Sequence, residues 1–496
     1  MNEGGKSDSP VVPVKPPNNA ASAAAEVVEG RGLAEGNTTS KTRPGHRAGP
    51  DAPSALDRVR EVARRDKDAR FTALLHHVDF VRLWAAYWAI RPQAAPGVDG
   101  VTWSTYGQDL EANLRDLHAR VHAGRYRARP SRRVYIPKAD GRQRPLGIAS
   151  LEDKILQRAV VEVLNAIYEE DFVGFSYGFR PGRSPHDALD ALTVGIEHKK
   201  VRWVLDADIR DFFTSLDHDW LQKFLEHRIA DKRVLRLIQK WVSAGVIEDG
   251  AWTASDVGAP QGASVSPLLA NIYLHYVLDR WVRQWRRRHA RGEVIIVRFA
   301  DDFVAGFEHE SDARRFLADL RDRFARFGLE LHPDKTRLIE FGRFAARNRK
   351  ARGVGKPETF DFLGFTHICG KTKTGHFWLT RQTISKRMRA KLADVKDQLK
   401  QRRHLPIPEQ GRWLASVVRG HLAYYAVPGN SEAIGAFRHQ VTRHWFRALR
   451  RRSQRTRLTW ERMYRLAARW LPPAHILHPY PRVRFDARTQ GRSPVR

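Results

Sequence analysis

Apolar residues along this chain occur either in short runs typical of strands or at the three- and four-residue spacing typical of helices. The most informative stretch is of the first kind. The segment Val294–Phe307 reads VIIVRFADDFVAGF, in which two apolar runs flank the adjacent acids Asp301 and Asp302. Each run is too short for a helix, so the pattern predicts a strand, a turn and a strand, with both acids at the tip of a hairpin. Because an unpaired charge is costly to bury, the acids are either residues of a solvated turn or ligands of a bound cation.

Other apolar runs predict further strands. Arg132–Ile148 has two such runs on either side of Asp140 and predicts a second hairpin. Trp203–Phe213, which reads WVLDADIRDFF, predicts a strand that ends in acids. Asp206 and Asp208 alternate on this strand and would point to the same face, so periodicity alone does not choose between them.

Helical spacing accounts for most of the remaining pattern. Apolar residues recur three or four positions apart in residues 55–90, 151–168 and 268–285, and helical patterns dominate beyond Thr366. Residues 1–54 are rich in Pro, Gly, Ala and Ser and hold few large apolar side chains. Such a segment cannot bury enough surface to offset the entropy of ordering, so we expect a disordered N-terminal tail.

The net charge of the chain indicates the class of its partner. The 496 residues include 87 Lys and Arg against 55 Asp and Glu, a net charge of +32, which indicates a polyanionic partner, with nucleic acid as the first candidate. The single cysteine, Cys369, excludes disulfides within the chain and cysteine-rich zinc sites. No apolar run is long enough to span a membrane and no signal peptide is evident, so we expect a cytoplasmic protein.

Arginines interleaved with aromatic residues are candidates for RNA contacts, because rings stack on bases and guanidiniums bind phosphates. One such stretch is Phe175–Ser184, FSYGFRPGRS, which could equally be a packed loop. Another lies near the end of the chain beside Trp445, Phe446 and Trp460, where a solvated charged face is the alternative. The predicted RNA-binding residues are Arg180, Arg183, Arg443, Arg447, Arg450, Arg451, Arg452 and Arg455.

Three acids, Asp208, Asp301 and Asp302, fall at the ends of separate apolar strands. Nucleotide polymerases of the palm type need such an arrangement, because two Mg²⁺ ions about 3.5–4 Å apart must bridge protein carboxylates and the phosphates of the incoming nucleotide. Lys138 and Arg144 flank the turn of the predicted hairpin at Arg132–Ile148. They are either solvated charges or a pair of cations that grip a triphosphate.

Eight sequence blocks occur in an order that resembles one family. They are PGVDG at 96–100, YIPK with GRQRPLGI at 135–148, YGFRPGRS at 177–184, ADIRDFF at 207–213, APQGASVSPLLANIYL at 259–274, RFADD at 298–302, LHPDKT at 331–336 and FLGF at 362–365. With these blocks, the chain resembles a bacterial group II intron-encoded reverse transcriptase and maturase from about Leu56 to Phe485. A single FADD would be a weak signal, whereas the ordered set is specific.

The resemblance implies a role for each candidate residue. It implies that Asp208, rather than Asp206, is the first metal-binding acid, and that Asp301 and Asp302 complete the catalytic set for two Mg²⁺ ions. The remaining implied residues concern the nucleotide: Lys138 and Arg144 bind its triphosphate, Phe213 excludes a ribose 2′-hydroxyl, Gln261 touches the nascent base pair, and Lys335 lies near the leaving pyrophosphate.

The resemblance also implies a fold and partners. The fold class is α+β, a right-hand polymerase with fingers and an antiparallel palm sheet over residues 55–365. A helical thumb and maturase domain over 366–485 and a tail over 486–496 follow. The implied partners are group II intron RNA, an RNA template with a DNA primer, dNTPs and target DNA, within a bacterial ribonucleoprotein.

Three departures from the family pattern stand out. Phe299 precedes the acids where the family usually has Tyr, and we expect activity to survive because both acids remain. Thr214 stands where the family continues with Asp. One cysteine cannot build the metal-binding cysteine pairs of the HNH endonuclease that many relatives carry, so we expect no endonuclease and priming from another 3′ end.

Two other functions remain open from the sequence. One is a splicing maturase whose polymerase is idle, against which the three intact acids argue. The other is a domesticated or defence-associated reverse transcriptase, against which the maturase-like C-terminal region argues. Splicing that is unaffected by Asp208→Ala, with no cDNA from either form, would favour the first, and absence of an intron RNA in the flanking DNA would favour the second.

Overall fold

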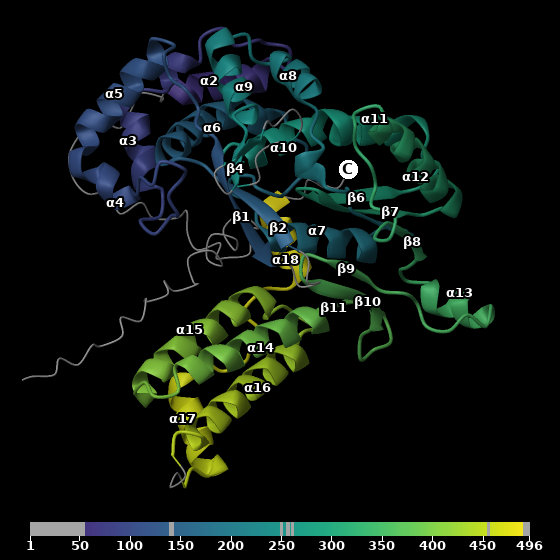
Figure 1. The fold of residues 1–496 in the computed structure, drawn as a ribbon. Coiled ribbons are helices and arrows are strands. Elements are labelled where there is room, and N and C mark those ends of the chain that lie inside the picture. Colours follow the sequence, from purple (N-terminus) through teal and green to yellow (C-terminus); the bar gives the residue numbers. More distant parts are fainter. Residues whose placement is uncertain are drawn as a thin grey trace, which may run out of the picture.

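The computed structural model describes residues 55–137, 143–248, 251–253, 258, 262–453 and 457–489 (Figure 1). The chain has a mixed α/β architecture with antiparallel hairpins and a helical C-terminal region, as the predicted fold class requires. The predicted N-terminal tail lies outside the described residues. None of the helices in the described ranges combines the length and the apolar character needed to cross a bilayer.

A four-stranded sheet with the order β6-β7-β3-β8, here called the central sheet, organises the middle of the chain. All its neighbouring strands are antiparallel. β6 and β7 form the predicted hairpin, which is therefore confirmed. The strands are β3 (Trp203–Ala207), β6 (Val294–Phe299), β7 (Asp302–Phe307) and β8 (Arg337–Glu340).

Both faces of the central sheet are covered by helices, which explains its apolar strands. On β3, Leu205 belongs to the same buried cluster as Phe316 of α12 (Glu310–Ala325). Its neighbour Val204 points to the other face and belongs to the cluster that includes Leu189 of α7 (Pro185–His198). The alternating side chains of a strand thus face two separate cores.

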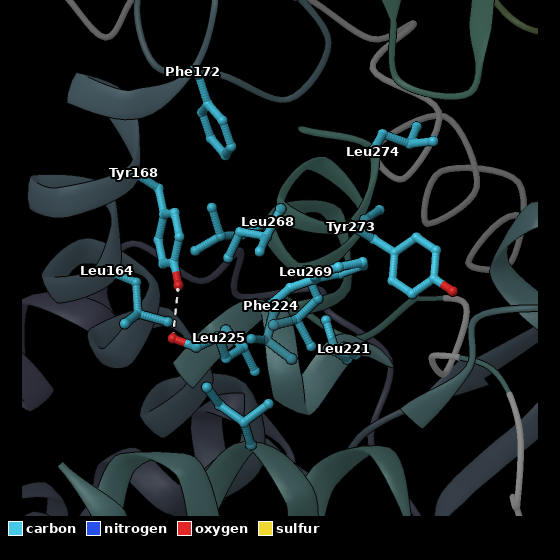
Figure 2. Close-up of a cluster of buried hydrophobic side chains, with 14 of the residues drawn as sticks. Leu164, Tyr168, Phe172, Leu221, Phe224, Leu225, Leu268, Leu269, Tyr273 and Leu274 are labelled. Carbon is cyan, nitrogen blue, oxygen red and sulfur yellow. Dashed lines mark hydrogen bonds between the residues drawn. The ribbon is translucent and has the colours of Figure 1, made fainter. Parts of the chain in front are cut away.

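The larger core joins helices that are far apart in sequence. Leu164, Tyr168 and Phe172 at the end of α6 lie beside the leucines of α8 and α10, as Figure 2 shows. The Tyr168 hydroxyl donates a hydrogen bond to the Leu225 carbonyl at 3.4 Å, so this buried polar group has a partner (Figure 2). The helices of this region are α2 (Ala55–Arg65), α3 (Phe80–Trp88), α4 (Trp103–Tyr106), α5 (Leu110–His122), α6 (Leu151–Asp171), α8 (His218–Glu226), α9 (Lys232–Val242), α10 (Ser266–Leu274) and α11 (Arg280–Arg288).

A second four-stranded sheet, with the order β2-β1-β4-β5, contains the other predicted hairpin. β1 pairs with β2 from Arg132 opposite Ile148 to Pro137 opposite Gln143, which confirms that hairpin. β1 also runs parallel to β4 at its other edge. The strands are β1 (Ser131–Pro137), β2 (Gln143–Ile148), β4 (Val246–Glu248) and β5 (Ala251–Thr253).

The region after Thr366 is less uniformly helical than predicted. The strand β10 (Phe365–Lys371) pairs with β9 (Phe360–Phe362) and with β11 (Phe377–Thr383) in a three-stranded sheet. Helices begin only at Ser385, because the alternating residues of β10 and β11 bury one side of this sheet. The later helices are α13 (Ala345–Ala351), which precedes this sheet, and α14 (Ser385–Gln401), α15 (Ile407–Tyr425), α16 (Ser431–Arg450), α17 (Trp460–Trp470) and α18 (Pro481–Thr489).

The last described helix, α18, leaves the other C-terminal helices and packs on α7. Its Phe485 is buried in the core that covers one face of the central sheet. Its Arg484 lies 3.3 Å from the buried carboxylate of Asp190 on α7, and that carboxylate also accepts from Arg381 of β11 at 2.8 Å. The C-terminal segment therefore completes the cover of the central sheet.

Candidate active site

The three predicted acids lie at one end of the central sheet. Phe299 pairs with Asp302 across the β6–β7 hairpin, which leaves Asp301 in the turn between the two strands. On the neighbouring strand Ala207 pairs with Phe303, so Asp208 follows at the level of Asp302. The structure thus brings together three acids that are separated by up to 94 positions along the chain.

The turn that carries these acids is held in an uncommon conformation. Ala300 has a positive φ of 57°, in the left-handed region that costs a non-glycine residue roughly 1–2 kcal/mol. Gly178 packs directly on it, because a Cβ atom at Gly178 would lie 2.3 Å from the Ala300 nitrogen. The Gly178 carbonyl accepts a hydrogen bond from Asn271 at 2.7 Å, which fixes the glycine in place.

Arg298, three residues before Asp301, lies beneath this turn with its guanidinium fully buried. Its Nε and Nη2 donate to the two carboxylate oxygens of Asp279 at 2.8 and 2.6 Å. Its Nη1 donates to Asn271 Oδ1 and to the Ala300 carbonyl, both at 3.0 Å. Its Nη2 also donates to a buried serine, Ser176 Oγ, at 2.7 Å. All five N–H groups are satisfied, so this side chain ties the turn to α10 and to the segment before α7.

The carboxylate of Asp208 already has a cationic partner. The Lys335 ammonium donates to its Oδ2, and the His332 amide donates to its backbone carbonyl at 2.8 Å. Two residues before Asp208, on β3, the carboxylate of Asp206 lies 3.5 Å from the guanidinium of Arg337. Burial raises the pKa of Asp206 to about 6, and Arg337 opposes that rise. The two acids that periodicity could not separate therefore have different partners, Lys335 for Asp208 and Arg337 for Asp206.

These acids offer the oxygen donors that Mg²⁺ prefers. In the structure, the carboxylate of Asp208 pairs with the ammonium group of Lys335. Within the described ranges, no three His, Cys, Asp or Glu side chains converge closely enough to form a metal site by themselves. Mg²⁺ commonly keeps several waters and takes only one or two protein carboxylates together with phosphate oxygens. The donor chemistry of the residues therefore fits Mg²⁺, with substrate oxygens needed to complete its shell.

Of the five residues predicted to bind the nucleotide, the structure describes Arg144, Phe213 and Lys335. Phe213 lies in a short 3₁₀ turn (Phe212–Thr214) after Asp211, and its ring packs edge-on against Phe212 at 5.5 Å. Gly258 packs on the backbone of this turn, since a Cβ there would lie 2.9 Å from the Phe213 carbonyl oxygen. Arg144 lies on β2 opposite Ile136. Lys138 and Gln261 fall outside the described residues.

Arg180 has an internal role instead of the predicted RNA contact. Its side chain is only 3% exposed, pairs with Glu169 at 2.9 Å and donates to the carbonyls of Val173 and Ser176, both at 2.8 Å. Arg183 is half-buried and donates to the Gly174 carbonyl at 2.6 Å. The arginines of FSYGFRPGRS therefore hold their own loop, which contradicts the predicted RNA contact for Arg180.

The arginines on and after α16 are placed differently from one another. Arg447, Arg450 and Arg451 are exposed, Arg443 is half-buried beside Gln440, and Arg455 lies outside the described residues. Arg452 donates to backbone carbonyls of the α14–α15 loop.

The neighbouring aromatic rings are not platforms for bases. Trp445 is fully buried and donates to Gln410 at 2.9 Å, and Phe446 stacks on Trp460 with ring centres 4.1 Å apart. Trp445 and Phe446 therefore belong to the helical core, whereas Trp460 stays 40% exposed.

The residues that hold the acids in place are those that the sequence did not reveal. Arg298, Asp279 and Asn271 are scattered over three elements, and only their meeting in space makes them a unit. One signal was available: an arginine inside the apolar run VIIVRF is costly to bury unless it has partners.

One family model and three related proteins match this chain. Residues 136–367 match the family model described as reverse transcriptase (RNA-dependent DNA polymerase). The chain is 38% identical over 239 residues to Protein YkfC of Escherichia coli, covering 42% of this chain and 62% of that protein. It is 34% identical over 238 residues to Group II intron-encoded protein LtrA of Lactococcus lactis, covering 48% of this chain and 39% of that protein. It is also 27% identical over 176 residues to Nuclear intron maturase 3, mitochondrial, of Arabidopsis thaliana, covering 35% of this chain and 23% of that protein. The matches thus span less than two thirds of each relative.

Proposed function

We propose that the protein is an RNA-directed DNA polymerase that also binds its group II intron RNA and promotes splicing, because residues 136–367 match the reverse transcriptase family model and the chain is similar to group II intron-encoded proteins. In this proposal it extends a DNA primer on an RNA template with dNTPs, and supports insertion of the intron into target DNA. The observation that carries the proposal is the meeting of Asp208, Asp301 and Asp302 at one end of the central sheet.

Reverse transcriptases use divalent metal ions, and in this protein Asp208 and Asp301, with Asp302 beside them, are the residues that would hold two Mg²⁺ ions. When bound, these ions lower the pKa of the primer 3′-hydroxyl and neutralise charge that develops at the α-phosphate. The protein's own contribution is positional: Arg298 and Gly178 fix the turn that presents the acids. A fixed turn avoids the cost of ordering the acids during each reaction.

The nucleotide would be held by side chains around these acids. Lys138 and Arg144 bind the triphosphate, and Gln261 contacts the nascent base pair. Phe213 excludes a ribose 2′-hydroxyl, and this role is supported by its position six residues after the strand that ends at Ala207. Lys335, which pairs with Asp208 in the structure, would supply a cation near the leaving pyrophosphate.

RNA binding by the C-terminal region is supported by the exposed Arg447, Arg450 and Arg451 of α16 and the turn that follows it. Together with the net charge of +32, these residues favour a protein that remains bound to its intron RNA as a ribonucleoprotein. The domain limits that accompany this proposal are 55–365 for fingers and palm and 366–485 for thumb and maturase.

The experiment that tests the polymerase is primer extension on an RNA template with dNTPs and Mg²⁺. Wild-type protein should synthesise cDNA, and Asp301→Asn should lose at least 100-fold in rate because a carboxylate ligand becomes a neutral amide. Asp322→Asn, at an exposed position on α12, is the matched control and should retain wild-type activity. Equal extension by wild type and Asp301→Asn would refute the catalytic assignment.

The splicing role is tested separately with the flanking intron RNA. The protein should accelerate splicing at Mg²⁺ concentrations where the RNA alone splices slowly, and Asp208→Ala should accelerate it equally because the polymerase acids are not needed to fold RNA. No acceleration by either form would refute the maturase role and leave the polymerase assignment standing.

A further inference from the structure

A basic hollow lies on the outer surface of the molecule between α8, α11 and α12. Its volume is about 710 Å³, and half of its lining residues are arginines. Figure 1 shows α8 and α11 at the opposite end of the molecule from α14–α17, so this hollow is separate from the basic surface of α16. We call it the α11 groove; its lining residues are Phe224, His227, Tyr276, Arg280, Trp281, Arg283, Gln284, Arg287, Arg288 and Arg323.

The charge of the α11 groove is not neutralised within the protein. Within the described ranges, no carboxylate lies within salt-bridge distance of Arg280, Arg283, Arg287 or Arg288. Exposed arginines on other helices commonly pair with an acid one turn away, as Arg314 does with Glu310 at 2.6 Å.

The helix dipole explains only part of this cluster. Its negative end stabilises cations in the last turn of a helix, which includes Arg287 and Arg288. Arg280 and Arg283 lie more than one turn before that end, where the effect has decayed. These two unpaired cations, one turn apart on the same helix face, therefore indicate an external anion.

One guanidinium of the groove is fixed in advance. A π-helical turn, η4 (His275–Asp279), joins α10 to α11, and Arg323 of α12 donates to its Tyr276 and Val277 carbonyls, both at 3.1 Å. The same guanidinium lies over the Phe327 ring at 4.5 Å. Burial lowers the pKa of Arg323, and the neighbouring Arg326 lowers it further, so a negative ligand here would be favourable.

The aromatic rings of the groove favour contact with phosphates over contact with bases. Tyr276 stacks on Phe224 and on His227, with ring centres 5.1 Å apart in both pairs. Arg280 lies over Tyr276, and Trp281 packs against the buried Phe316. Because these rings already contact one another or a guanidinium, they do not offer an open platform on which an unpaired base would stack.

We propose that the α11 groove binds the phosphodiester backbone of double-helical RNA, outside the site that holds primer and template. The spacing from Arg280 to Arg287 on α11 is about 10 Å, which is long enough for the two guanidiniums to reach different phosphates of one strand. The preference for a polyanion rests on the groove alone, and the choice of RNA rests on the proposed function. Contact with backbone and not with bases makes this binding independent of sequence.

The test compares two variants that lose the same charge. The groove variant is Arg280→Gln, Arg283→Gln and Arg287→Gln, and the control is Arg60→Gln, Arg115→Gln and Arg314→Gln, three exposed arginines that pair with acids. The probe is a fluorescein-labelled, blunt-ended 20-base-pair RNA duplex, and its affinity is measured by anisotropy between 50 and 300 mM KCl.

The groove variant should bind the RNA duplex at least about 10-fold more weakly at 150 mM salt, while the control changes less than about 3-fold. Its slope of log affinity against log salt should be shallower by roughly 2–3, because each lost phosphate contact contributes about 0.7–0.9. A lysine version of the groove variant should keep the wild-type slope. Thermal midpoints of all variants should stay close to wild type, since exposed substitutions change stability by at most about 0.5 kcal/mol.

Several outcomes would overturn the proposal. Equal losses in the groove and control variants would mean that only total charge matters, and a loss on a DNA duplex without a loss on RNA would assign the groove to DNA. Primer extension on a short primer and template should be unchanged in the groove variant. If wild-type protein makes no cDNA but its RNA affinity still depends on the groove, the proposed function fails and the groove assignment stands.

Discussion

Replacement of Arg298 by Met removes a fully buried guanidinium and leaves the Asp279 carboxylate buried without its cation. Breaking such a pair costs about 3–5 kcal/mol, since the remaining charge has neither water nor a partner. The Ala300 carbonyl and Asn271 also lose their donor, which adds at least about 1 kcal/mol. We therefore expect a loss of roughly 4–6 kcal/mol in the free energy of unfolding.

A second substitution separates the charge from the position of the turn. In Arg298→Met with Asp279→Leu the uncompensated charge is gone, so most of the pair's cost should be recovered. The Ala300 carbonyl still lacks its donor in the double variant, so the turn that carries Asp301 remains loose. We expect the double variant to be at least about 2 kcal/mol more stable than the single variant and still slow in primer extension.

The assay is thermal unfolding followed by tryptophan fluorescence, together with primer extension and the Mg²⁺ concentration that gives half-maximal rate. With an unfolding entropy of about 2.1 cal/mol/K per residue, a cost of 4–6 kcal/mol in a region of about 310 residues corresponds to a fall of roughly 6–9 °C in the unfolding midpoint. A single-variant midpoint within 3 °C of wild type would refute the energetic reasoning. A double variant that recovers both stability and the wild-type Mg²⁺ requirement would refute the role of Arg298 in positioning the turn.

Three further predictions concern single side chains. Gly178→Ala should reduce primer extension at least 10-fold with little effect on RNA affinity, because the new Cβ would lie 2.3 Å from the Ala300 nitrogen and displace the turn; unchanged extension would contradict this. Phe213→Ala should raise incorporation of rNTPs relative to dNTPs, measured by competition on one template, and an unchanged ratio would remove Phe213 from the nucleotide site. Burial lowers the pKa of His367 to about 3, so below pH 6.5 only the unfolded state takes up its proton and stability falls. The stability of wild type relative to His367→Phe should therefore fall by about 1.4 kcal/mol between pH 7.5 and 5.5, measured by urea unfolding at both values, and a constant difference would be inconsistent with a neutral buried imidazole.

The parts of the site that follow from local pattern could be predicted from the sequence. Short β-branched runs around Asp301 and Asp302 can form only a hairpin, and the strand before Asp208 has the same character. The reverse transcriptase match over residues 136–367 agrees with the order of the sequence blocks.

The parts that depend on distant contacts could not be predicted. An exposed and a buried arginine look alike in a sequence. The sequence therefore predicts an RNA contact for Arg180, although its guanidinium pairs with Glu169 and donates to the Val173 carbonyl. Trp445 and Phe446 suggested base stacking for the same reason, because the helices that bury them lie elsewhere in the chain. The strands β10 and β11 were hidden among basic residues whose alternation becomes visible only when they pair.

The packing of α18 on α7 has a consequence for how the protein is made. The helix α7, which covers one face of the central sheet, lacks its last packing partner until residues 481–489 leave the ribosome, although the strands of that sheet were completed about 140 residues earlier. During that interval the nascent chain exposes the apolar side of α7 and the buried carboxylate of Asp190. Synthesis of the C-terminal segment therefore sets the moment at which α7 gains its last packing partner and Asp190 its second arginine.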